Sequence, residues 1–358
     1  MEKRLIFIIV LKISILLHVY PQDISNSTSI DKKQSHVNIN CFVYHRFGDE
    51  RYPSTNVSEE YFESHLRYLK DNDYEVLTLG EAVHLLRSGV NSKPKLVVLT
   101  IDDGYKSFLT SGMPLLRKYG FKATMFINTN QVGYPDFLTW EEILSLKKEG
   151  IEIGNHSHSH DYFVDFQSGQ LIEKFNADLV ISQNMFEEKL GYKPELFSYP
   201  FGEYSNTMKM ELTRFGFIGA VGQNSGVISL LSDIYALPRF PMTGIFSKPE
   251  KFVEKLKMKA LPVQPVLEYD PIVAENNPPE LLLKLVTPDL IQTSGMQCFI
   301  NGKTDCELNY NSSDSIIRIK CRNYLNSRRT LYTITAPSSE NTNVWYWYSW
   351  LWIIPGVN

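Results

Sequence analysis

The chain has 358 residues, of which 43% are hydrophobic and 21% charged, and this composition predicts a folded chain with one large domain and room for a small one. The formal net charge of −4 gives no broad basic character. We therefore expect no nucleic-acid partner.

The first residues are typical of an export signal. Lys3 and Arg4 form a positive start, and residues 5–19 are mostly apolar, a run that is short for a membrane span. Residues 1–22 are therefore expected to be a signal peptide. Because no small-residue cleavage pattern follows, an uncleaved anchor with membrane association is an alternative, as is a buried strand or helix. Residues 23–36 are polar and predict a linker, and export predicts a periplasmic, cell-envelope or extracellular location.

Strand-like and helix-like segments alternate over residues 37–264. Apolar runs at residues 38–44, 95–101, 121–127, 151–153, 197–199 and 217–221 predict strands. Ser58 and the capping-box residues Thr78 and Thr139 predict helix starts, and residues 171–190 have helical periodicity. This alternation predicts a mostly parallel sheet covered by helices, with its chemistry at the carboxyl ends of the strands.

The pattern changes to short strands separated by Asn, Ser, Gly and Pro over residues 265–358, which predicts a small all-β domain. Its last strand, expected over residues 344–354, contains four tryptophans that could stack on sugar rings, although burial in a β core is the preferred interpretation. Export would permit one disulfide among Cys298, Cys306 and Cys321, and the sequence does not select the pair. Cys41 lies in an apolar run and is expected to pack as a small hydrophobic residue.

Two adjacent carboxylates, Asp102 and Asp103, follow the apolar strand 95–101 and precede Gly104. Neighbouring side chains at a strand end point in different directions, so one can bind a metal while the other acts as a base. A solvated Asp-Gly turn is the structural alternative.

Three histidines follow the strand 151–153 in the segment 155–160. If this segment is helical, His156 and His160 lie on one face and can bind one cation, whereas His158 points elsewhere. Two imidazoles and one carboxylate leave positions open for water and substrate, which is typical of a catalytic metal site.

A third strand end leads into Ser198-Tyr199-Pro200-Phe201-Gly202. This segment could offer a backbone N–H to a developing oxyanion, with Tyr199 and Phe201 forming the wall of a pocket. A turn built on Pro and Gly is the structural alternative.

The segments TIDDG, NHSHSH and SYPFG, in this order, resemble the first three motifs of the polysaccharide deacetylase family (NodB homology, carbohydrate esterase 4). The resemblance covers roughly residues 38–260 and implies a distorted (β/α) barrel. It implies that Asp102 is the general base and that Asp103, His156 and His160 are the metal ligands. It also places Phe201 where the family has the tyrosine whose N–H contributes to the oxyanion hole.

Two departures from the family pattern concern residues that assist the chemistry. Ser198 stands where the third motif commonly has an arginine that supports the base, and we expect Arg239 to take over this role. The chain has no histidine after His160, so the expected catalytic acid is His45, with a structural histidine as the alternative. This arrangement resembles the circularly permuted branch that includes enzymes acting on poly-β-1,6-N-acetylglucosamine.

These expectations define a metal-dependent N-deacetylase that acts on a polysaccharide and releases acetate. Zinc is the expected metal, and nickel or cobalt could also fit. A metal-dependent amidohydrolase acting on a small N-acylated substrate and an inactive carbohydrate-binding protein are the alternatives. The loss of the third-motif arginine favours the inactive protein, whereas the presence of both aspartates and both histidines argues against it.

Overall fold

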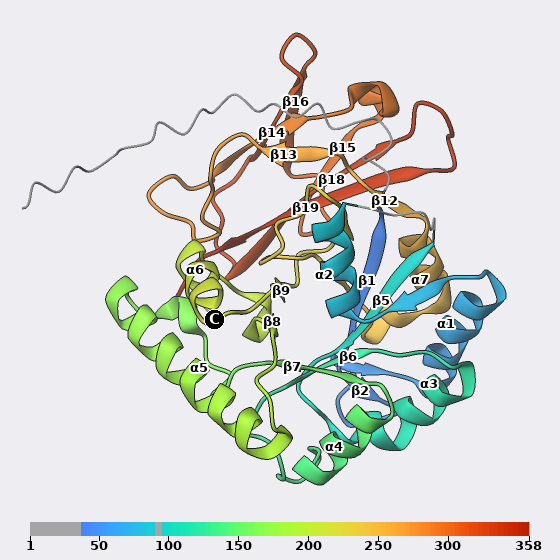
Figure 1. Cartoon of the computed structure of the whole chain (residues 1–358). Coiled ribbons are helices and arrows are strands. Elements are labelled where there is room, and N and C mark those ends of the chain that lie inside the picture. The colour runs from blue at the N-terminus through green and yellow to red at the C-terminus, as the bar shows by residue number, and fades with distance from the viewer. Residues whose placement is uncertain (1–36, 90–94, 358) are drawn as a thin grey trace, which may run out of the picture.

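The computed structural model describes residues 37–89 and 95–357, so the expected signal peptide and linker lie outside the described residues. A curved, mainly parallel sheet forms the larger part of the molecule, with strand order β10-β1-β5-β6-β7-β8-β9 and with β4 and β11 paired to β5 and β1 (Figure 1). Its strands are β1 (Ile39–Tyr44), β4 (Glu75–Leu77), β5 (Leu96–Ile101), β6 (Thr124–Ile127), β7 (Glu152–Asn155), β8 (Leu196–Ser198), β9 (Gly219–Val221), β10 (Val227–Ile228) and β11 (Phe240–Pro241).

The segment 237–241 links the two sides of this sheet. Leu237 pairs in parallel with Val221 of β9, and Phe240 pairs in parallel with Phe42 of β1. The sheet therefore curls into a distorted barrel, as predicted. β1 and β5 are buried along their whole length, which explains their continuous apolar sequences.

Helices pack around the outside of the barrel (Figure 1). They are α1 (Glu59–Asp71), α2 (Leu79–Ser88), α3 (Met113–Tyr119), α4 (Trp140–Lys148), α5 (Ser168–Leu190), α6 (Asn206–Arg214) and α7 (Pro249–Leu256). The predicted starts are confirmed: Ser58 caps α1, and complete capping boxes begin α2 at Thr78 and α4 at Thr139. A short parallel pair, β2 (Arg46–Phe47) and β3 (Asn56–Val57), lies beyond β1.

Two further sheets form the all-β part that the sequence predicts, shown in orange and red in Figure 1. One has the order β12 (Met258–Ala260), β19 (Trp345–Ile353), β18 (Arg329–Pro337) and β15 (Gln297–Ile300). The other has the order β13 (Val263–Pro265), β14 (Glu280–Leu285), β17 (Ile316–Cys321) and β16 (Cys306–Asn311). β12 precedes the expected boundary after residue 264 and β13 crosses it, so both β-sheets include residues on the N-terminal side of that boundary.

The cysteines are distributed as the sequence allowed. Cys298 and Cys306 form a disulfide that joins β15 to β16, and thus one β-sheet to the other. Cys321 faces Cys306 across the β16–β17 pair but remains a buried free thiol. Cys41 is buried and free, which confirms its role in packing.

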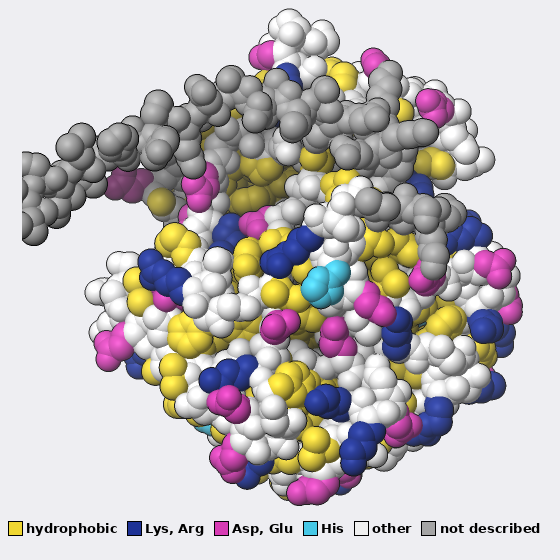
Figure 2. All heavy atoms as spheres, in the orientation of Figure 1, with side chains coloured by type: hydrophobic (Ala, Val, Ile, Leu, Met, Phe, Trp, Pro, Cys, Tyr) yellow, Lys and Arg dark blue, Asp and Glu magenta, His cyan; other side chains and the backbone are white. Residues whose placement is uncertain are grey.

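The β domain shares packing surface with the barrel. Leu351 and Ile353 of β19 belong to the same buried cluster as Phe197 and Tyr199, and the Trp347 ring contacts Phe240 edge-on at 5.7 Å. Trp352 is buried, and Trp347 and Trp350 are partly buried against the core clusters, so the core interpretation is favoured for these three tryptophans. Figure 2 shows acidic and basic side chains intermixed over the visible face of the molecule.

Candidate active site

The acidic pair lies where β5 ends. Asp102 is fully buried, and its backbone N–H donates to the Tyr44 carbonyl at the end of β1. Asp103 and Gly104 both have positive φ, 75° and 77°. The chain therefore turns sharply after Asp102, which directs the two carboxylates to different partners.

Arg239 pairs with the Asp102 carboxylate at both ends. Its Nη1 lies 2.7 Å from Oδ1 and its Nη2 lies 2.8 Å from Oδ2, and both side chains are fully buried. Ser198 Oγ donates to Oδ2 over 3.1 Å and accepts from Arg239 Nη2 over 3.0 Å. The serine in the third motif and the arginine on the barrel-closing segment thus contact the same carboxylate.

Burial alone would raise the pKa of the Asp102 carboxyl. The positive charge of Arg239 outweighs burial, so the pKa of Asp102 is lowered below its ordinary value. Asp102 is therefore ionised at neutral pH, as a general base must be.

Asp103 converges with the two predicted histidines. His156 Nε2 and His160 Nε2 lie 3.3 and 3.5 Å from Asp103 Oδ1, and the two nitrogens are 3.2 Å apart. Ligand atoms about 2.0–2.1 Å from a tetrahedral zinc ion are roughly 3.3 Å from one another. The spacing of the three donor atoms therefore fits one metal ion.

The histidine segment is a turn, so the conditional expectation of a helix at 156–160 is wrong. Ser157 and His160 have positive φ, and Asp178 of α5 accepts the N–H groups of His158 and Ser159 at 2.7 Å each. These bonds fold the segment tightly enough to bring His156 and His160 together. His158 contacts Thr129 through Nδ1 instead, consistent with the expected separate direction.

Both histidines can offer a lone pair to a cation. His156 Nδ1 donates to the Ser198 carbonyl over 2.7 Å and Nε2 faces Asp103, so Nε2 is the nitrogen that the neutral imidazole presents to a cation. Burial, and next the charge of His156, lower the pKa of His160 to about 4, so its imidazole is neutral at pH 7.

His45 directly follows β1 on the same edge of the barrel. Its charge interacts with both Asp102 and Asp103, and its Nδ1 is a buried atom without a hydrogen-bond partner. His45 is partly exposed, so an incoming molecule can reach it.

The third motif places its two aromatic residues differently. Phe201 lies beside the metal-ligand candidates, with its ring centroid 4.6 Å from that of His160. The expectation that Tyr199 forms a pocket wall is wrong, because its side chain is fully buried and its hydroxyl donates to the Tyr235 carbonyl over 2.9 Å.

Other side chains near the site were not expected from the sequence. The Arg46 guanidinium lies between the rings of Tyr105 and Tyr52, 3.5 and 3.9 Å from their centroids, and pairs with Asp49. Burial, and next the charge of Asp103, raise the pKa of Tyr105 to about 12. The position of Arg46 directly after His45 was the sequence feature that could have predicted its place near the site.

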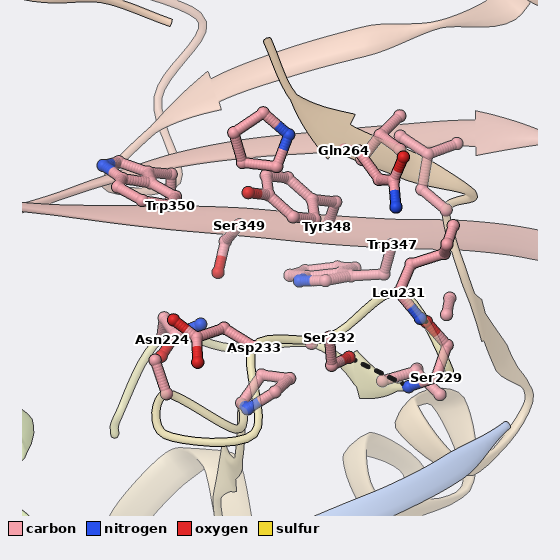
Figure 3. Close-up of a pocket in the computed structure, with 18 of the residues that line it drawn as sticks. Asn224, Ser229, Leu231, Ser232, Asp233, Gln264, Trp347, Tyr348, Ser349 and Trp350 are labelled. Atoms are coloured by element: carbon pink, nitrogen blue, oxygen red, sulfur yellow. Dashed lines mark hydrogen bonds between the residues drawn. The ribbon is translucent and has the colours of Figure 1, made fainter. Parts of the chain in front are cut away.

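A cavity of about 370 Å³ lies away from these residues, between the barrel and the β domain. Figure 3 shows Trp347, Tyr348 and Trp350 of β19 on one side, and Asn224 and Asp233 from the segment between β9 and β11 on the other. The Trp347 Nε1 donates to Ser225 across this interface. Two tryptophans of the row, Trp347 and Trp350, therefore border this cavity, and none of the metal-ligand candidates lines it.

Comparison with known proteins identifies relatives over the barrel. Residues 89–219 match the model of the polysaccharide deacetylase family. The Bacillus subtilis protein YxkH is 28% identical over 208 residues, 58% of this chain and 72% of its own. A Staphylococcus aureus poly-β-1,6-N-acetyl-D-glucosamine N-deacetylase is 25% identical over 211 residues, 56% of this chain and 72% of its own. The solved structure of the Streptococcus pyogenes deacetylase PplD in complex with acetate superimposes with a TM-score of 0.57 at 23% identity, covering 62% of this chain and 99% of that one, and so shares the fold.

Proposed function

We propose that this chain hydrolyses the N-acetyl group of N-acetylglucosamine residues in a polysaccharide and releases acetate, and the match of residues 89–219 to the polysaccharide deacetylase family supports this proposal. One observation carries this proposal. A buried carboxylate held ionised by Arg239 lies next to a carboxylate and two imidazoles that converge on one point. Metal-assisted hydrolysis of an amide needs this combination of a base and a Lewis-acid site.

Asp103, His156 and His160 are the proposed metal ligands, and zinc is the proposed metal because it accepts a carboxylate and two imidazoles with open positions for water and substrate. A metal bound there supplies polarisation of the acetamide carbonyl and a lower pKa for water. The hydrogen bond from His156 Nδ1 to the Ser198 carbonyl fixes the orientation of that imidazole.

Asp102 is the proposed general base, with Oδ1 as its reacting atom. Oδ2 accepts from both Arg239 and Ser198, which occupies its two lone pairs. Oδ1 accepts from Arg239 Nη1 alone, and that nitrogen also donates to Thr100 Oγ1 over 3.1 Å. One lone pair of Oδ1 therefore remains to take a proton from the attacking water.

Phe201 and His45 complete the proposed reaction. The Phe201 N–H donates to the oxygen of the tetrahedral intermediate, and protonated His45 delivers a proton to the leaving amine as the carbon–nitrogen bond breaks. Asp102 and His45 then hold opposite protonation states, so activity should follow a bell-shaped pH profile.

Two observations favour an active enzyme acting on a polymer. Arg239 supplies the charge beside the base that the missing third-motif arginine would supply, which argues against an inactive binding protein. Tyr162 stacks on Phe201 and Tyr52 stacks on Arg46, and these two rings are 38% and 42% exposed. Exposed aromatic rings beside the site suit successive sugar units better than a small N-acylated substrate.

Poly-β-1,6-N-acetylglucosamine is the substrate to test first, because a relative is named for its deacetylation. Export of the chain, with residues 1–22 as signal or anchor, is part of the same proposal. Within the described residues, no helix has both the length and the apolar character needed to cross a bilayer.

The test measures acetate release from poly-N-acetylglucosamine and chitooligosaccharides before chelation, after chelation and after zinc is restored. Asp102→Asn should abolish release while leaving metal content unchanged, because the metal ligands remain. Asp314→Asn, in the turn between β16 and β17, is the matched control and should behave like wild type. Release that survives chelation, or that persists in Asp102→Asn, would contradict the proposal.

A further inference from the structure

The turn that carries Phe201 has an unfavourable backbone conformation. Phe201 has φ 58° and ψ 5°, a left-handed conformation that residues with a side chain rarely adopt. Such a conformation persists where surrounding contacts determine it. The contacts of this turn therefore decide where the Phe201 N–H points.

An aromatic stack holds the ring of Phe201. The Tyr162 ring lies on it with centroids 3.7 Å apart and planes 7° from parallel, and the His160 ring contacts it edge-on with centroids 4.6 Å apart. The position of Phe201 is thus coupled to that of a proposed metal ligand.

Two consecutive arginines of the β domain reach this turn. Arg329, the first residue of β18, donates from Nη1 to the Phe201 carbonyl over 2.8 Å. The Arg328 guanidinium lies 3.9 Å from the centroid of Tyr162, the residue that stacks on Phe201. The β domain therefore contacts both the backbone and the stacking partner of Phe201.

Arg328 is itself fixed by two carboxylates of the barrel. It donates from Nε and Nη2 to Glu203 at 2.8 Å each, and from Nη2 and Nη1 to Asp165 at 2.9 and 3.1 Å. Glu203 is 3% exposed and directly follows the Pro200–Gly202 turn. Fork-shaped pairing of this kind fixes orientation as well as distance.

We propose that the β domain completes the active site, with Arg328 and Arg329 as positioning residues that hold Phe201 against His160 and aim its N–H at the oxyanion. This inference rests on the proposed function, because it assigns a purpose to the Phe201 N–H. Both arginines are more than 120 residues away from the turn along the chain and lie outside the three motifs. The β domain is thus a required part of the catalytic unit.

Arg329→Ala is the most informative variant, because its side chain is 45% exposed and its loss should not unfold the protein. We expect kcat to fall about tenfold, since a small displacement of a transition-state donor is costly, while KM stays within about twofold. Arg329→Lys should recover part of kcat, because an ammonium group can also donate to the carbonyl. Zinc affinity should stay unchanged in both variants.

Arg328→Ala should have a larger effect on kcat, and Arg328→Lys should not restore it, because a lysine cannot pair with Glu203 and Asp165 as a planar fork. Arg318→Ala is the matched control for Arg329→Ala, because the Arg318 side chain is 52% exposed against 45% for Arg329 and pairs with Glu280 inside the β domain. It should leave kcat and KM unchanged.

Hydrogen exchange of residues 199–204, measured in the same variants, separates this inference from the proposed function. Faster exchange in Arg329→Ala than in Arg318→Ala is the expected result. Equal exchange in the two variants, or wild-type kcat in Arg329→Ala, would overturn the inference. If wild type releases no acetate but exchange accelerates, the proposed function fails and the positioning of the turn stands.

Discussion

The acidic pair after β5 and the Phe201 turn after β8 lie on the same edge of the barrel, but different parts of the chain hold them. Asp102 is anchored by the β1–β5 pairing and by Arg239, all within the barrel. The Phe201 turn depends on Arg329 of the β domain and on a stacked tyrosine. Groups at buried strand ends are fixed by the sheet, whereas a group on a strained turn needs contacts from outside it.

Replacing Arg239 should cause the largest loss of activity, because Arg239 supports the base Asp102. In Arg239→Met, the largest charge that opposes the effect of burial is lost, so the pKa of Asp102 rises and a smaller fraction of the base is ionised at a given pH. We expect turnover at pH 7 to fall by roughly 10³-fold, with the acid limb of the pH–rate profile moved to higher pH. Unchanged turnover would contradict a supporting role for Arg239.

The same variant changes how stability depends on pH. In wild type, the lowered pKa of Asp102 contributes stability that is present above its unfolded value and lost as pH falls. In Arg239→Met the pKa is raised, so Asp102 should contribute stability at low pH that is lost as pH rises. Urea unfolding at pH 3, pH 5 and pH 8 would show this difference: wild type should lose the contribution of Asp102 between pH 5 and pH 3, and the variant should lose its contribution between pH 5 and pH 8.

Substitution of His45 tests whether proton delivery to the leaving amine is separate from proton removal by Asp102. We expect His45→Ala to lower kcat by roughly 10²-fold and to remove the alkaline limb of the pH–rate profile, because the proton donor to the leaving amine is lost. His84→Ala, on the exterior helix α2, is the control. A wild-type rate that only rises with pH into mild alkalinity would argue against His45 as the acid.

Thr139 provides a contrast outside both regions. Thr139→Ala removes the side-chain cap of α4 and should lower the free energy of unfolding by about 1 kcal/mol. Acetate release by the folded variant should equal that of wild type, since the cap contacts neither region. A large loss of kcat would show that activity reports general stability, and the comparison of the two regions would lose its meaning.

The sequence predicts those site residues that directly follow a strand. Asp102, Asp103 and His156 follow apolar strands, so their place on one edge of the barrel is predictable. The convergence of His160 depends on positive φ at Ser157 and His160, and Asp178 stabilises this turn from a distant helix. The spacing of the two histidines alone predicted their convergence only on the condition that the segment is helical.

Other features depend on contacts that no local pattern encodes. Tyr199 directly follows β8, and its side chain points into the core, where its hydroxyl donates to the Tyr235 carbonyl. The local sequence does not indicate this direction. The pairing of Cys298 with Cys306 joins two sheets whose arrangement the sequence does not specify. Arg328 and Arg329 meet the Phe201 turn only because the β domain packs against the barrel.

The segment 237–241 has a consequence for the order of folding events. It joins β9 to β1 and also carries Arg239, so the last link in the barrel wall brings the counter-charge to the base. A chain whose helices have formed but whose barrel is still open would bury Asp102 without its partner. Recovery of enzymatic activity after dilution from denaturant should therefore lag behind recovery of helical circular dichroism. The rate at which activity returns would then report the rate of barrel closure.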